Sequence, residues 1–146
     1  EPGSYLVEDS LSLNSITYSG ADLTYVLMDE SEAPDALWSD DYIHIDGDFS
    51  ISFTTNKIVQ GNYTVFMQAD FFNTDNAVVD VFIDGKPVGG TVDLANDPDV
   101  NVTADAPFGQ KELGTVSFVR YGSHKITIRT LIPGSLSWDY IRFEPL

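Results

Sequence analysis

GTVSFVRYGSHKITIRTLIPGSLSWDYIRFEPL, residues Gly114–Leu146, is the stretch that decides the fold. It predicts three β-strands joined by two tight turns, at Gly122-Ser123 and at Pro133-Gly134. Ile126 and Ile128 alternate with polar residues, which is the period of a strand that buries one face. Proline and glycine at the two central positions are typical of a type II turn. We therefore expect the chain to end in consecutive strands that close a β-sandwich.

The same two-residue period runs through the middle of the chain. Phe49, Ile51 and Phe53 share one face of a predicted strand, and residues 61–70 alternate in the same way. Residues 23–28 are rich in β-forming side chains, whereas residues 29–41 form an acidic stretch with a proline, which favours a loop.

Turn signals separate the later strands. Asp84-Gly85 follows the apolar run 78–83 and predicts a two-residue hairpin, because both central positions must accept positive φ. Residues 93–111 are polar and contain two prolines, so we expect a long irregular connection of the kind that is often functional. About eight to ten strands at this spacing predict one all-β domain over residues 1–146, an antiparallel β-sandwich or jelly roll.

Composition excludes several classes of partner. The 146 residues are 42% hydrophobic, enough for a core, and contain no cysteine. The net charge of −16 argues against binding to nucleic acid or to an anionic membrane surface. No apolar run is long enough to span a membrane, so we expect no membrane insertion by this domain. Twelve of the 23 acidic residues precede Lys57, the first basic residue, which predicts a solvated acidic face or a cation site.

Four short motifs carry a family resemblance. They are GNYTV at 61–65, VFIDGKPV at 81–88, GSHKITI at 122–128 and SWDYIRF at 137–143. In this order they resemble the galactose-binding-like jelly rolls of carbohydrate-binding modules, families 6 and 35 in particular, and related modules of bacterial cell-surface and adhesion proteins. The resemblance implies a module of a longer exported protein, located extracellularly or on a bacterial cell surface. Because these motifs are turn and core positions, they specify fold better than function.

The resemblance also implies a structural calcium site. In that family an acidic residue near the N-terminus and the Asp that opens the last strand hold Ca²⁺, and Glu8 and Asp139 stand at corresponding places. Carboxylates are the hard oxygen ligands that calcium prefers. Alternatively, Asp139 caps a turn or pairs with Arg142 or Arg129, and Glu8 is solvated.

A glycan is the ligand that the resemblance implies, held on loops by aromatic rings and amides. The chain departs from the family pattern, since the long loop has no Trp and Ser137 stands where an Asn is frequent. Trp38 either replaces the missing ring or folds back as a lid on the core. Trp138 faces away from Ile141 if the last strand alternates strictly, and then covers the second face of the sheet or stacks on a ligand. The candidate ligand-binding residues are Trp38, Tyr42, Asp99, Asn101, Phe108 and Gln110.

No catalytic constellation is present. The acidic residues of 29–41 are typical of a solvated face, and Ser123 and His124 are adjacent on a predicted strand, so their side chains point to opposite sides. We therefore expect that this domain has no enzymatic activity. Two functions stay open: a module that binds carbohydrate weakly, and a structural or adhesion domain that supports neighbouring domains of the same chain without binding sugar.

Overall fold

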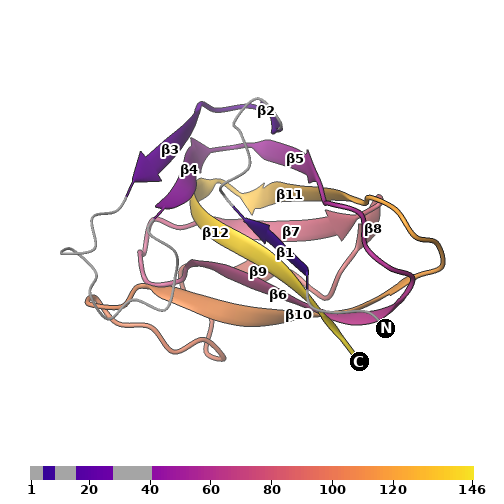
Figure 1. The fold of residues 1–146 in the computed structure, drawn as a ribbon. Coiled ribbons are helices and arrows are strands. Elements are labelled where there is room, and N and C mark those ends of the chain that lie inside the picture. Colours follow the sequence, from indigo (N-terminus) through magenta and orange to yellow (C-terminus); the bar gives the residue numbers. More distant parts are fainter. Residues whose placement is uncertain (1–4, 9–15, 28–40) are drawn as a thin grey trace.

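The protein is an antiparallel β-sandwich, as predicted. The computed structural model describes residues 5–8, 16–27 and 41–146, and within them it contains strands and no helix. Two sheets pack face to face (Figure 1). Sheet A contains β1 (Tyr5–Glu8), β3 (Leu23–Leu27), β4 (Asp41–Gly47), β6 (Gly61–Asp70), β10 (Phe108–Phe118) and β12 (Gly134–Pro145). Sheet B contains β2 (Thr17–Ser19), β5 (Ser50–Thr54), β7 (Val78–Ile83), β8 (Lys86–Pro87), β9 (Val92–Asp93) and β11 (Lys125–Ile132).

The last three strands do not pair with one another. Sheet A runs in the order β10-β6-β12-β4-β3, with β1 beside β12, and sheet B runs β2-β5-β11-β7-β8, with β9 beside β7. The chain thus crosses from one sheet to the other after β10 and again after β11 (Figure 1). The prediction of a tight turn between consecutive strands at Gly122-Ser123 is therefore wrong, because β10 and β11 lie in different sheets. Gly122 instead exchanges two backbone hydrogen bonds with Ile58, of 2.8 and 3.1 Å.

The second turn of this stretch also differs from its prediction. Gly134 does not have the positive φ that a type II turn requires at its third position. Its role is close approach, because a Cβ there would lie 2.7 Å from both the Ala77 nitrogen and the Asp75 oxygen. The neighbouring Ser135 N–H donates to the Asp75 carbonyl at 2.9 Å. By contrast, the hairpin at Asp84-Gly85 is confirmed, with φ values of 52° and 82° and Ile83 paired with Lys86.

Alternation along the strands builds the core as predicted. In β5 the Ser and Thr side chains face outwards and the apolar ones are buried, and β6 buries the Tyr63, Val65, Met67 and Ala69 side chains completely. Large and fully buried side chains from both sheets meet between them. These include Ile43, Ile45, Ile51, Tyr63, Met67, Leu94, Ile126, Ile128, Leu136, Trp138 and Phe143.

A register shift in β12 decides where its side chains point. Trp138 is paired with Ala69 and Tyr140 with Gln68, so Asp139 is one residue more than β6 has opposite it, as in a β-bulge. The shift reverses the alternation, and Trp138 joins Ile141 and Phe143 in the core with no exposed surface. Both readings of Trp138, as a cover for the outer face or as a ligand platform, are therefore wrong.

The predicted irregular connection is shorter than expected. Strand β9 ends at Asp93 and β10 begins at Phe108, so the segment without regular structure is 94–107. The described residues contain no helix with the length and apolar character that crossing a membrane requires.

Candidate ligand-binding face

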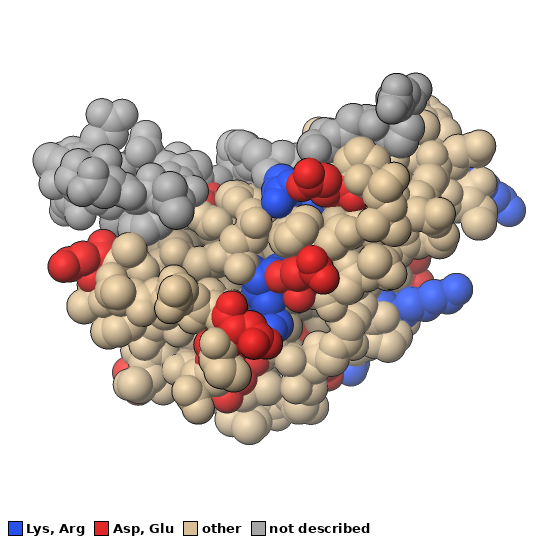
Figure 2. Space-filling model, turned by 90° about the horizontal axis from the view of Figure 1, so that it is seen from below, with Lys and Arg blue, Asp and Glu red and all other residues tan. Residues whose placement is uncertain are grey.

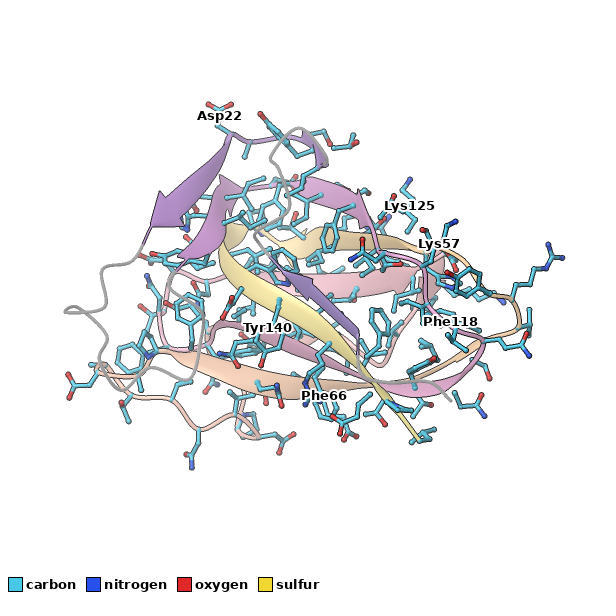
Figure 3. All side chains as sticks on the ribbon, viewed as in Figure 1. Asp22, Lys57, Phe66, Phe118, Lys125 and Tyr140 are labelled. Carbon is cyan, nitrogen blue, oxygen red and sulfur yellow. The ribbon has the colours of Figure 1, made fainter. Side chains whose placement is uncertain are left out.

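Two rows of paired residues cross the outer face of sheet A. Gln68 at the centre of β6 lies opposite Gln110 of β10 and Tyr140 of β12. Two residues along, Phe66 lies opposite Glu112 and Arg142. Directly opposed residues of antiparallel strands point to the same face with their Cβ atoms about 5 Å apart. Figure 3 places Phe66 and Tyr140 along the lower part of the sheet, beside β6.

Hydrogen bonds connect the polar members of these rows. The Gln110 amide nitrogen donates to the Tyr140 hydroxyl at 2.7 Å, and that hydroxyl donates to the Gln68 amide oxygen at 3.1 Å. Arg142 donates to the Gln110 amide oxygen at 3.1 Å. Arg142 can only donate, so it fixes the orientation of the Gln110 amide, and the Tyr140 hydroxyl links that amide to Gln68.

Arg142 also joins the network to an aromatic ring. Its guanidinium lies 4.4 Å from the centre of the Phe66 ring, and it forms an ion pair with Glu144. A guanidinium held over a ring gains from the ring quadrupole, by about 0.5–1 kcal/mol at an exposed site. Figure 2, which looks from below, shows basic side chains in the centre of the face beside acidic ones rather than as a separate basic patch.

Tyr140 stays a neutral phenol over the physiological range. Burial raises its pKa above the usual 10.0, the neighbouring Asp139 raises it further, and the contacts with Gln110 and Arg142 oppose the rise. The neutral hydroxyl can therefore donate to one amide and accept from another at the same time.

A pair of rings stands at one end of this face. Tyr42 of β4 and Phe108 of β10 lie with their ring centres 5.0 Å apart at 55°. Strands β6 and β12 lie between β4 and β10 in the sheet, so the two rings meet across them. Phe108 is buried, and Tyr42 is partly exposed. Of the two predicted aromatics that the structure describes, Phe108 is a strand residue rather than a loop residue, and Tyr42 is the more exposed.

A shallow hollow of about 460 Å³ joins the loop 94–107 to this face. Asp99 and Gln110, two of the predicted ligand-binding residues, line it together with Phe66, Lys111 and Glu112. The ion pair between Lys111 and Asp97, at 2.6 Å, holds the loop against β10. Gln110 and Phe108 were predicted to lie on the loop. They belong to the strand instead, because β10 begins earlier than expected.

The remaining predicted site residues fall elsewhere. Asn101 is exposed on the loop and does not line the hollow, and Trp38 lies outside the described residues. Sequence reasoning overlooked Phe66, Gln68, Tyr140 and Arg142. Phe66 and Gln68 alternate with the core residues of β6, so their position on the outer face could have been predicted from the sequence. For Tyr140 and Arg142 the sequence alternation is misleading, because the bulge at Asp139 reverses which face they occupy.

Asp139 is one of the two residues expected at a calcium site. Its side chain is completely buried, and it lies inside β12 rather than at a turn. Strand β1 pairs with β12 so that Glu8 lies opposite Tyr140, one residue from Asp139. Arg142 forms its ion pair with Glu144, and Arg129 lies over Phe82 on sheet B. Carboxylates from Glu8 and Asp139 would be the ligands if calcium binds, and the described residues contain no group of three or more metal-binding side chains.

Known structures share this architecture. The sequence matches no protein-family model and no curated protein. A family 35 carbohydrate-binding module from Clostridium thermocellum superimposes with a TM-score of 0.59 at 15% identity, over 97% of this chain and 98% of the module. The fold is that of carbohydrate-binding modules. The C-terminal family 6 module (CBM6) of LamC, a marine laminarinase from Zobellia galactanivorans, matches with a TM-score of 0.62 at 14% identity, over 97% and 99% of the two chains.

This carbohydrate-binding-module fold also matches a part of a larger enzyme. The Paenibacillus xanthan lyase superimposes with a TM-score of 0.68 at 16% identity, over 92% of this chain. The match spans only 13% of the lyase chain. The resemblance to families 6 and 35 is confirmed at the level of the fold.

Proposed function

We propose that this domain is a non-catalytic carbohydrate-binding module and that it binds sugar on the outer face of sheet A. The observation that carries the proposal is the array formed by Gln68, Gln110, Tyr140 and Arg142 beside the ring of Phe66. The fold shared with modules of families 6 and 35 supports it.

The chemistry of the array suits a saccharide. A sugar hydroxyl both donates and accepts hydrogen bonds, and the Gln110 amide, the Tyr140 phenol and the Arg142 guanidinium together offer both kinds of partner. Gln68 is buried and holds the Tyr140 hydroxyl in place. The partly exposed rings of Tyr42 and Phe66 provide apolar surface for the C–H groups of a pyranose. Among the described residues of this face, none is arranged as a nucleophile beside a general base, which supports binding without catalysis.

Affinity is expected to be weak. Pockets for tightly held small ligands enclose most of the ligand surface, whereas this face is an open sheet with a hollow of about 460 Å³. Weak binding suits a module of a longer exported protein, because linked modules gain effective concentration from one another. The match to one part of the long xanthan lyase chain supports such a multidomain setting. The location that we propose for it is extracellular or on a bacterial cell surface.

A matched pair of variants tests the proposal. Arg129 lies 4.7 Å over the ring of Phe82 on sheet B, as Arg142 lies over Phe66 on sheet A. Calorimetric titration with a panel of neutral plant, host and microbial oligosaccharides should show binding that Phe66→Ala weakens about tenfold and Phe82→Ala leaves unchanged, since a stacked ring contributes about 0.5–1.5 kcal/mol beyond its buried area.

A structural or adhesion domain without a sugar ligand is the second candidate. The mutual hydrogen bonds of Gln68, Gln110 and Tyr140 favour it, because a network that satisfies itself needs no ligand. Absence of heat with every oligosaccharide of the panel would leave this candidate standing and reject the first.

A further inference from the structure

A second groove is separate from the hollow near loop 94–107. It has a volume of about 610 Å³ and runs between β8 of sheet B and the C-terminal half of β10 of sheet A. Residues 115–119 form one wall, and Lys86, Pro87 and Val88 form the other. It shares no lining residue with the hollow on the sheet face.

The wall formed by β10 is a free strand edge. β10 pairs with β6 on one side, and within the described residues no other strand or backbone hydrogen bond engages residues 115–119. Every second backbone N–H and C=O of an edge strand points away from its neighbour and is available to another strand.

Native edges are normally protected, and this one is not. Proteins protect exposed edges with very short strands, lysine and proline, and β8 shows all three in Lys86 and Pro87. Residues 115–119 read TVSFV, with no charge and no proline, and the bulge of β10 lies earlier, between Glu112 and Gly114. A β-prone, uncharged edge of this kind is a template for pairing with another chain.

Two basic side chains, Lys86 and Arg120, line the groove, and Lys125 follows the lining residue His124 in the chain. Lys86, Arg120 and Lys125 have no acidic partner within ion-pair distance among the described residues, although the chain has 23 acidic residues and seven basic ones. The one acid in the groove, Asp84, accepts from His124 at 2.6 Å and from the Lys125 N–H at 2.9 Å. Figure 2 shows blue side chains projecting from the right-hand end of the molecule. Figure 3 places Phe118 and Lys125 at that end, with Lys125 above Phe118 in the view.

We propose that this groove binds an extended, acidic polypeptide segment of a protein partner, which adds as a further strand to β10 along residues 115–119. The free backbone groups would supply the hydrogen bonds, and Lys86 and Arg120 would face the carboxylates of the segment. An extended partner of about five residues spans the length of this edge at about 3.3 Å per residue.

Both ends of the groove fit such a strand. At one end the backbone of Gly89 lies so close to Leu113 that a Cβ would come within 1.9 Å of the Leu113 oxygen, which closes the groove. At the other end Val119 and Tyr121 are 83% and 62% exposed and offer apolar surface to the side chains of a bound segment.

The test uses the whole domain, labelled with ¹⁵N, and a short acetylated and amidated peptide of alternating Glu and Val. Three probes are compared with it: the same peptide with its central Val replaced by Pro, the same peptide with Lys in place of Glu, and an oligogalacturonate. Amide shifts and slowed hydrogen exchange are read at residues 115–119. Lys86→Gln and Arg120→Gln are titrated beside Arg129→Gln, which removes an equal charge from the outer face of sheet B.

The Glu-Val peptide should shift and protect amides of residues 115–119, and the Pro and Lys peptides should bind at least about tenfold more weakly. Lys86→Gln and Arg120→Gln should each weaken binding about two- to fivefold, and Arg129→Gln should leave it unchanged. The proposal is overturned if the Pro peptide binds as well as its parent, or if no peptide shifts these amides. It is also overturned if the oligogalacturonate binds there more tightly than the peptide. Binding of neutral sugars at the sheet face is measured separately by Phe66→Ala, so the two proposals fail independently.

Discussion

The indole of Trp138 packs on the ring of Phe53 with their centres 4.8 Å apart at 42°, and the contact joins the two sheets. Trp138 comes from β12 and Phe53 from β5, and both are buried. Within the described residues the Trp138 indole N–H has no hydrogen-bond partner, so part of the gain from burying the ring is offset by an unsatisfied donor.

Trp138 is expected to be among the most costly positions to truncate. Trp138→Ala should lower the free energy of unfolding by about 3–5 kcal/mol, because it leaves a cavity between the sheets. Trp138→Phe should cost about 1–2 kcal/mol, since it removes the unsatisfied N–H together with part of the ring. Urea unfolding followed by far-ultraviolet circular dichroism measures both. Equal losses for the two variants would contradict the role of the ring volume.

Gly134 should tolerate no side chain. Its Cβ position meets backbone atoms of Ala77 and Asp75, which cannot rotate away, so Gly134→Ala should cost about 1–3 kcal/mol of stability. Gly90 is the matched control: nothing lies within 4 Å of its Cβ position, and its φ is not positive. Gly90→Ala should change stability by less than about 0.5 kcal/mol in the same urea titration. A neutral Gly134→Ala would show that the Asp75–Ala77 backbone moves freely.

Stability should fall at alkaline pH through Tyr140. Its pKa is raised in the folded state above the usual 10.0, so the folded protein holds this proton more tightly than the unfolded chain. The contribution is complete below about pH 10 and is lost as pH rises through the folded-state pKa. Tyr140→Phe should lose less stability over this window than the parent. The urea unfolding midpoint of each protein is measured as a function of pH. Equal losses of stability in parent and variant would assign the alkaline effect to other groups.

Calcium is expected to stabilise the domain if Glu8 and Asp139 are its ligands. A ligand that binds only the folded state at about 100 times its Kd adds about 2.7 kcal/mol, so Ca²⁺ should raise the melting temperature and a chelator should reverse the rise. Asp139→Asn should abolish the dependence on Ca²⁺. A melting temperature that is the same with chelator and with added Ca²⁺ would remove the calcium hypothesis.

Local patterns predicted the parts of the fold that depend on neighbours in sequence. Alternation at Phe49, Ile51 and Phe53 identified β5 and its buried face, because burial of one face imposes a period of two. The hairpin at Asp84-Gly85 was predictable because few residues accept positive φ at both central positions. The prediction of an irregular segment up to Lys111 was wrong for its last four residues, since pairing with β6 overrides their weak local preference.

The candidate site was only partly visible in the sequence. Asp99 and Gln110 were predicted and do lie together, but the prediction placed Gln110 on a loop, whereas it stands on a strand. Tyr140 and Arg142 were missed, because one extra residue at Asp139 changes which face every following side chain occupies.

The stretch Gly114–Leu146 by itself determined that three strands end the chain and that Ile126, Ile128, Ile141 and Phe143 are buried, since strand period and apolarity are properties of the local sequence. Only the tertiary structure decided which strands pair. It placed β10 and β12 on the two sides of β6 in sheet A, and it placed β11 in sheet B. The reason is that hydrogen-bond partners in a sandwich come from residues distant in the chain. It also turned Trp138 into the core and Tyr140 onto the outer face through a register shift that no local pattern encodes.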